Sequence, residues 1–216
     1  MVSDPTTPNA AKRLTLVTAI VLALGVIAVV VWLALRPAVT PAPVGYEDQP
    51  TLGQANAPLK VILFENFMCE YCKGFEEEVF PQLKRDYIDT SKIEVYYVNL
   101  AAWGSKQAEL SALAGECAYR QDEAAFWQFK SDVYRAQGSW QTLDDLLNVA
   151  GATTEVESLR QCVKEQRYAS EVQRDIDLVD KVGVQGTPSI IVGIQGFEAP
   201  DYATLKAAID AGLAGS

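Results

Sequence analysis

The chain alternates short apolar runs with longer segments in which apolar residues recur at helical spacing. Two runs rich in β-branched and aromatic residues, LKVILFEN at 59–66 and KIEVYYVNL at 92–100, predict buried strands. The segment between them has helical spacing, and Pro81 within it predicts a kinked or interrupted helix. A helix that connects two neighbouring strands of one sheet favours a right-handed crossover, and therefore a parallel pair.

After the second strand, the pattern predicts a helical block, a hairpin and a last helix. Apolar positions at helical spacing predict five amphipathic helices, at about 105–121, 123–137, 142–150, 155–167 and 169–182. The segments SIIVGI and GFEA predict a hairpin that turns around Gly196. The stretch YATLKAAIDAGLA predicts the last helix, with Asp201 as its N-cap.

The N-terminal part carries a long apolar segment at 14–35 without a charged side chain. At about 1.5 Å per residue, such a helix is about 33 Å long and can cross a hydrocarbon core. A cleaved signal peptide is the alternative, but its apolar region is usually only about 7–15 residues long. Because Lys12 and Arg13 precede the segment, we expect a retained transmembrane signal anchor, with residues 1–13 cytoplasmic and the rest of the chain outside the cytoplasm.

The stretch at 36–58 contains five prolines and little apolar periodicity. Proline-rich composition predicts a semi-extended spacer between the anchor and a domain that begins near Leu59. The remaining length fits one domain.

Charge and composition exclude several classes of function. The sequence has 18 basic and 28 acidic residues, a formal net charge of −10, which disfavours binding to nucleic acid. It contains no histidine, so Ser-His-Asp and Cys-His catalysis are excluded and the commonest transition-metal ligand is missing. We expect no cofactor.

The motif Cys69-Glu70-Tyr71-Cys72 comes directly after the first predicted strand and opens the following helix. Unpaired N–H groups and the helix dipole at that position stabilise a thiolate. A spacing of two residues lets the second sulfur reach the first within one turn and resolve a mixed disulfide. We therefore predict Cys69 as the nucleophile and Cys72 as the resolving cysteine. Two unrelated buried thiols are the alternative.

The other two cysteines, Cys117 and Cys162, favour a structural disulfide over a metal site. A closed zinc site usually takes its ligands in two close pairs, and here the second pair is missing. Both residues lie on apolar helix stripes, so buried free thiols are one interpretation. An oxidising compartment outside the cytoplasm favours a Cys117–Cys162 disulfide, which is our prediction.

Three motifs together resemble a known family. LGQANAPLKVILFENFMCEYCKGFEEEVFPQL resembles the opening of membrane-anchored DsbA-like thiol–disulfide oxidoreductases; GECAYRQDEAAFWQFKSDVYRAQ resembles their helical insert and VGVQGTPSIIVG their cis-proline segment. The resemblance implies an α/β thioredoxin-like fold formed by 59–104 and 183–216, with an all-helical insert at 105–182. It also implies that Pro188 is a cis-proline facing the cysteine pair, and that the backbone of Thr187 binds a substrate strand.

The chain departs from the family between its cysteines. Strongly oxidising members carry Pro-His there, whereas this chain has Glu70 and Tyr71. An acid beside the sulfur opposes thiolate formation, so we expect a less oxidising couple than in those members. Glu65 is a candidate buried carboxylate for proton transfer, with a solvated strand-end glutamate as the alternative.

These features predict a thiol–disulfide oxidoreductase that introduces disulfides into secreted or membrane proteins. The resemblance implies reoxidation by a membrane partner, either a DsbB-like protein or a vitamin K epoxide reductase homologue. The same chemistry run in reverse, as a reductase or isomerase, is the nearest alternative. A tethered thioredoxin-like binding or chaperone module without redox turnover is the other.

Overall fold

The computed structural model of the protein describes residues 17–28, 45–101, 105–151 and 155–215. By internal contacts the chain divides into two units, Met1–Ala38 and Val39–Ser216. Within the first unit, 17–28 form a helix whose apolar side chains are largely exposed. The predicted cytoplasmic segment 1–13 and the rest of the predicted anchor 14–35 lie outside the described residues. Over the part of the chain that is described, no helix combines the length and apolar character needed to cross a membrane.

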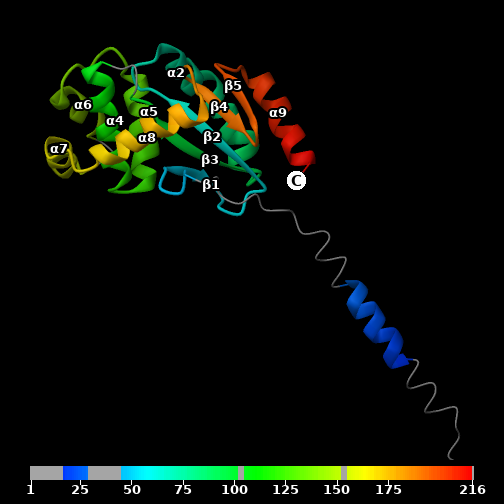
Figure 1. The fold of residues 1–216 in the computed structure, drawn as a ribbon. Coiled ribbons are helices and arrows are strands. Elements are labelled where there is room, and N and C mark those ends of the chain that lie inside the picture. Colours follow the sequence, from blue (N-terminus) through cyan, green and yellow to red (C-terminus); the bar gives the residue numbers. More distant parts are fainter. Residues whose placement is uncertain (1–16, 29–44, 102–104, 152–154, 216) are drawn as a thin grey trace, which may run out of the picture. The chain divides into compact units, whose positions relative to one another are not determined.

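The second unit is built on a five-stranded mixed sheet with the strand order β1-β3-β2-β4-β5 (Figure 1). The strands are β1 Thr51–Gly53, β2 Leu59–Glu65, β3 Ile93–Asn99, β4 Ser189–Val192 and β5 Gln195–Glu198. The central pair, β2 and β3, is parallel, which confirms the predicted crossover, and its register places Glu65 opposite Asn99. The other pairs are antiparallel.

The connection between β2 and β3 is helical but interrupted. It comprises α2 Glu70–Gly74, a π-helical turn η1 Phe75–Val79, α3 Phe80–Leu83 and a second π-helical turn η2 Lys84–Ile88. The interruption begins before Pro81: the N–H of Phe80 donates to the carbonyl of Phe75, five residues back. A proline lacks an N–H donor and clashes with the carbonyl four residues earlier, so the wider turn accommodates it.

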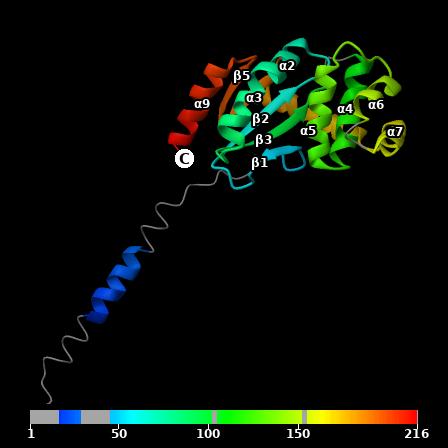
Figure 2. The same ribbon diagram turned by 180° about the vertical axis from the view of Figure 1, so that it is seen from behind.

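Alternate residues of β2 face two separate cores. Val61 and Leu63 belong to the larger core, which is covered by α2, α3 and α9 Tyr202–Ala214 (Figure 2). Ile62 and Phe64 belong to the smaller one, where they meet Val179 of α8 Ala169–Val182. The central strand is therefore buried on both faces, as a continuous apolar run predicts.

The helical segment contains the predicted helices. They are α4 Lys106–Tyr119, α5 Glu123–Arg135, α6 Leu143–Ala150, α7 Val156–Lys164 and α8. Ser105, Asp122 and Thr142 cap the first three by accepting hydrogen bonds from backbone N–H groups. The helices α4, α6 and α7 gather at one end of the unit and α9 lies at the other. One boundary differs from the prediction: α8, counted with the insert at 105–182, covers a face of the sheet.

The folded unit begins earlier than Leu59, so the predicted linker 36–58 is wrong at its C-terminal end. Tyr46 is buried in the smaller core, and β1 pairs with β3. The carbonyl of Thr51 accepts from the indole N–H of Trp127 at 2.7 Å. A three-residue strand is too short to give a periodic pattern, and the prolines around it indicate a spacer instead.

The closing hairpin also turns at a different place. Gly196 lies within β5, opposite Ile191, and the turn is at Gly193 and Ile194. Gly193 has φ of +61°, a left-handed conformation that favours glycine. The predicted N-cap Asp201 is confirmed, because its carboxylate accepts from the N–H of Thr204 at 2.8 Å.

Two helices of the insert are joined covalently. Cys117 on α4 and Cys162 on α7 form a disulfide with an S–S distance of 2.02 Å and a sequence separation of 45. Both residues are buried in the larger core. In the chain-entropy description, closing a loop of this length stabilises the fold by about 3–4 kcal/mol.

Candidate active site

Cys69 stands where the central strand passes into the first helix. β2 ends at Glu65, and a turn at Asn66 leads to Cys69, the N-cap residue of α2. The side chain of Asn66 accepts from the N–H of Met68 at 2.8 Å, and its carbonyl accepts from the N–H of Cys69 at 2.9 Å. These bonds hold the cysteine at the start of the helix, as the sequence predicts.

Thr187 and Pro188 lie directly beside Cys69. Their peptide bond is cis. In its protonated form, the thiol of Cys69 donates to the carbonyl oxygen of Thr187, with 3.2 Å between Sγ and O. Residues far apart in sequence, the CxxC motif and the segment before β4, therefore meet at one surface. This is the juxtaposition that the cis-proline segment implied.

The two sulfurs of the motif have opposite properties. Cys69 is partly exposed, Cys72 is buried and both are free thiols in this structure. A hydrogen bond from the thiol of Cys72, together with bonds from Thr187 and the backbone of α2, lowers the pKa of Cys69 to about 5 against the effect of burial. Burial, the bond to Cys69 and the charge of Glu65 raise the pKa of Cys72 far above its usual range. At neutral pH the pair thus carries one negative charge, on Cys69.

Because the thiol of Cys72 is the largest cause of the low pKa at Cys69, replacing Cys72 with alanine is expected to raise that pKa. We expect an increase of at least one unit, about 1.4 kcal/mol in the balance between thiol and thiolate. The measurement is a pH titration of thiolate absorbance in the reduced variant and the reduced wild type. An unchanged midpoint would mean that Thr187 and the backbone of α2 stabilise the thiolate without Cys72.

Glu65 is fully buried in a charge cluster beneath the cysteines. Its carboxylate is 3.1 Å from Nζ of Lys130 on α5, which also pairs with Glu76. Burial raises the pKa of Glu65 above its ordinary value although Lys130 opposes this. Burial would lower the pKa of Lys130, but the two carboxylates raise it above its usual value. The predicted alternative, a solvated strand-end glutamate, is wrong, because the strand ends inside the domain under α5.

Aromatic rings complete the surroundings of Lys130. Its Nζ lies 4.4 Å from the ring centroid of Phe80 and 5.2 Å from that of Tyr134. Such cation–π contacts add stabilisation where the cation is desolvated. The insert therefore contributes a positive charge, inside an apolar shell, to the region below the CxxC motif. Lys130 gave no signal in the sequence, because it resembles any polar residue of an amphipathic helix.

The two residues between the cysteines lie on the surface. Glu70 is exposed and Tyr71 is 76% exposed. Water and salt screen the charge of an exposed carboxylate. Neither side chain appears among the groups that set the pKa of Cys69. Their predicted part in tuning the redox couple stays a prediction.

The insert also holds the loop before Cys69 through Gln137, a residue that the sequence analysis did not single out. Its side-chain amide donates to the carbonyl of Phe67 at 2.9 Å and to that of Cys69 at 3.0 Å. Both bonds are made to the main chain. A glutamine at the end of a predicted helix carries no pattern that could have revealed this contact.

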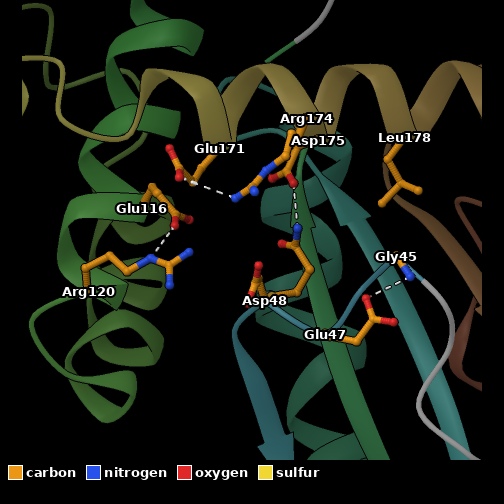
Figure 3. A pocket seen from close by; sticks show the side chains of 10 residues that line it. Gly45, Glu47, Asp48, Glu116, Arg120, Glu171, Arg174, Asp175 and Leu178 are labelled. Atoms are coloured by element: carbon orange, nitrogen blue, oxygen red, sulfur yellow. Dashed lines mark hydrogen bonds and ion pairs between the residues drawn. The ribbon is translucent and has the colours of Figure 1, made fainter.

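A polar pocket of about 220 Å³ lies between α4, α8 and the segment before β1, away from the residues predicted for the site (Figure 3). Glu116 of α4 and Arg120, the C-cap residue of that helix, pair on one side of it at 2.8 Å. The buried carboxylate of Asp175 accepts from the side chain of Gln49 at 2.6 Å, and burial raises the pKa of Asp175 to about 7. In the described ranges, no group of three or more acidic or cysteine side chains is arranged to hold a metal ion.

Comparisons with known proteins agree with this geometry. The family model described as Thioredoxin matches residues 46–211. The chain is 36% identical over 172 residues to the probable disulfide bond formation protein D of Bacillus anthracis, covering 76% of this chain and 78% of that protein. It is 33% identical over 178 residues to disulfide bond formation protein D of Bacillus subtilis, covering 78% and 79%.

Solved structures show the same fold. The crystal structure of oxidised BdbD from Bacillus subtilis superposes with a TM-score of 0.74 at 31% identity, covering 82% of this chain and 97% of that one. DsbA of Chlamydia trachomatis, at 22% identity and a TM-score of 0.69, shares the fold over 80% of this chain and 94% of its own. Together with the CxxC motif beside Pro188, these findings show that the chain belongs to the DsbA-like thiol–disulfide oxidoreductases of the thioredoxin fold.

Proposed function

We propose that this chain introduces disulfide bonds into proteins outside the cytoplasm, with Cys69 as the nucleophile and Cys72 as the resolving cysteine. The observation that carries the proposal is the difference between the two sulfurs. Cys69 is partly exposed at the start of α2, beside Thr187 and the cis-proline Pro188, and its pKa is lowered to about 5, whereas Cys72 is buried and its pKa is raised. A sulfur that is stable as a thiolate leaves readily and stabilises the reduced form, which makes the couple oxidising. Relatives named disulfide bond formation proteins support this direction.

The reaction begins from the Cys69–Cys72 disulfide. A client thiolate attacks Sγ of Cys69; the bond between the two enzyme sulfurs breaks, and its electron pair passes to Cys72. A second client thiolate then attacks the client sulfur of the mixed disulfide, forming the client disulfide and releasing Cys69 as a thiolate. The client loses two electrons and the enzyme gains two.

Glu65 is suited to supply the proton that Cys72 needs. The raised pKa of Cys72 means that its sulfur takes up a proton when it leaves as an anion. Glu65 is buried, interacts electrostatically with Cys72, and has a pKa near 7, so a part of the population is protonated at neutral pH. The carboxyl group of Glu65, with a pKa near neutral pH, is therefore suited to transfer this proton.

Thr187 and Pro188 are proposed to hold the client segment. The carbonyl of Thr187 already contacts the reactive sulfur, at 3.2 Å. When a client sulfur is bonded to Cys69, its own backbone lies within reach of the backbone polar groups of Thr187. An extended segment could therefore pair with this residue as an additional strand does.

We place the chain as a single-pass membrane protein with the catalytic unit outside the cytoplasm. The support is the uncharged segment at 14–35 and the basic pair Lys12 and Arg13 before it. A membrane partner, DsbB-like or a vitamin K epoxide reductase homologue, would take the electrons from the reduced pair. Glu70 and Tyr71 stand between the cysteines in place of Pro-His, which supports a less oxidising couple than that of the Pro-His enzymes.

The test is thiol trapping in cells combined with the equilibrium reduction potential. We expect the Cys69–Cys72 pair to be largely oxidised at steady state, with a potential more oxidising than the thioredoxin value of about −270 mV. The Cys117–Cys162 disulfide serves as an internal control for complete labelling. A largely reduced active pair would favour the reductase or isomerase instead.

A further inference from the structure

A shallow groove of about 280 Å³ opens beside the reactive cysteine. Apolar lining comes from Tyr71 of α2 and from Phe75 and Val79 of η1 on one side, and from Pro188 and Pro200 on the other. The groove therefore runs between the segment that carries the reactive sulfur and the segments before β4 and α9. Its floor suits the aliphatic part of a long side chain.

The groove is continuous with the site of sulfur exchange. Pro188 lines it and follows Thr187, whose carbonyl is 3.2 Å from Sγ of Cys69. Tyr71 lines it and lies between the two cysteines of the motif. A client whose sulfur attacks Cys69 therefore has its neighbouring side chains at the mouth of this groove.

The charged side chains that line the groove are all acidic. Glu70, Glu78 and Asp201 line it, and no lysine or arginine is among its described lining residues. Hydrogen bonds from Thr204 lower the pKa of Asp201, so that carboxylate stays ionised. Glu70 and Glu78 are exposed and have no ion pair within the described residues. An apolar floor with negative edges matches a lysine or arginine side chain, whose stem is apolar and whose end is a cation.

We propose that this groove selects client segments that carry lysine or arginine close to the reacting cysteine. The inference rests on the proposed function and specifies its substrate class. Two effects act in the same direction. The acidic rim attracts the cation, which steers the encounter. A cation beside the client thiol also lowers the pKa of that thiol, so more of the attacking thiolate is present.

The test compares two peptides that differ only in flanking charge. Each is an unstructured dithiol peptide, with either lysine or glutamate beside both cysteines. The rate at which each reduces the oxidised full-length chain is divided by its rate with neutral hydroxyethyl disulfide, which removes the intrinsic difference in thiol reactivity. We expect the normalised rates to favour the lysine peptide by about tenfold at low salt and less at high salt.

Matched charge variants distinguish the effect of the groove on this preference from the effect of the net charge of the whole chain. The double variant Glu70→Gln/Glu78→Gln is expected to reduce the preference to about threefold or less, because the rim loses two of its three carboxylates. A ratio of two rates on one enzyme cancels any change in its reduction potential. The control Glu77→Gln/Asp180→Asn removes the same charge from exposed positions outside the groove, and should keep the preference.

Two outcomes would overturn the inference while leaving the proposed function in place: equal normalised rates for the two peptides, or an equal loss of preference in both double variants. The second would assign the effect to the net charge of −10. If the oxidised chain accepts electrons from neither peptide, the proposed function itself fails. The expected pattern, a preference lost only in the groove variant, supports both.

Discussion

Replacing Cys69 with serine is expected to abolish the oxidation of client thiols. Serine has nearly the same size but cannot form the disulfide that a client attacks, so the rate should fall to that of spontaneous exchange, a loss of about a thousandfold or more. The measurement is the rate of disulfide formation in a reduced peptide under an added oxidant. Because Cys69 is at the surface and its thiol makes one hydrogen bond to Thr187, the variant should stay folded.

The Cys72→Ala variant is the matched control for this result. Its Cys69 thiolate can attack a client that carries a disulfide, which forms a mixed disulfide and releases one client thiolate. Because Cys72 is missing, no enzyme thiol resolves this bond, and the mixed disulfide should accumulate as a covalent adduct. Cys69→Ser should give no adduct. A Cys69→Ser protein that still oxidises clients would contradict the proposed mechanism. One that loses turnover but binds clients as before separates catalysis from simple binding.

Replacing Lys130 with methionine is expected to destabilise the protein by about 3–5 kcal/mol, because Glu65 and Glu76 lose the cation that compensates their burial. Glu65 and Lys130 are both completely shielded from solvent. The measurement is the free energy of unfolding in urea, for the reduced protein, at several pH values. Methionine fills most of the volume of the lysine stem, so the loss of stability is due to the missing charge more than to missing packing contacts.

The pH dependence of this variant gives a sharper test than its stability at one pH. The pKa of Glu65 is raised from its ordinary 4.5 to about 7 in the fold, and without Lys130 it should rise further. A carboxyl that is neutral in the fold but ionised after unfolding makes the fold less stable as the pH rises above the unfolded pKa. Below about pH 7 this carboxyl is neutral in the fold of both proteins, so the deficit of Lys130→Met should begin to grow near pH 7, where the wild-type Glu65 ionises, and should increase as the pH rises further.

Lys84→Met is the control, because it removes the same charge from an exposed pair. Lys84 and Asp89 pair at 2.6 Å, with side chains 46% and 52% exposed. Exposed pairs contribute only about 0–1 kcal/mol, so this variant should unfold close to the wild type at every pH. Equal changes in the free energy of unfolding in the two lysine variants would mean that the buried cluster stabilises the fold no more than an exposed ion pair does.

The sequence could predict the parts of the fold that repeat a strong pattern. The central strand is apolar on both faces, and the insert helices begin at Ser105, Asp122 and Thr142, residues that cap helices by their own side chains. The CxxC motif after a strand predicted a cysteine pair at the start of a helix, which is where the structure has it. Each of these patterns depends on residues close in sequence, so contacts with distant segments did not alter the structure that it predicts.

The parts that could not be predicted depend on contacts between distant segments. β1 is held by its pairing with β3 and by Trp127, and a three-residue strand has no pattern of its own. Lys130 and Gln137 reach the active site only because α5 packs against the CxxC segment. Their sequence positions, in and just after an amphipathic helix, are indistinguishable from those of solvent-facing residues.

The buried bridge between α4 and α7 has a consequence for the biogenesis of the protein. Cys117 and Cys162 are only 1% and 4% exposed in the finished fold, so the packed helices shield both sulfurs from an oxidant in solution. We therefore expect the two sulfurs to be joined while the newly made chain is still open. Each newly made molecule of this oxidoreductase therefore needs one disulfide to be formed in its own chain. A mature copy with an oxidised Cys69–Cys72 pair has the chemistry to form it.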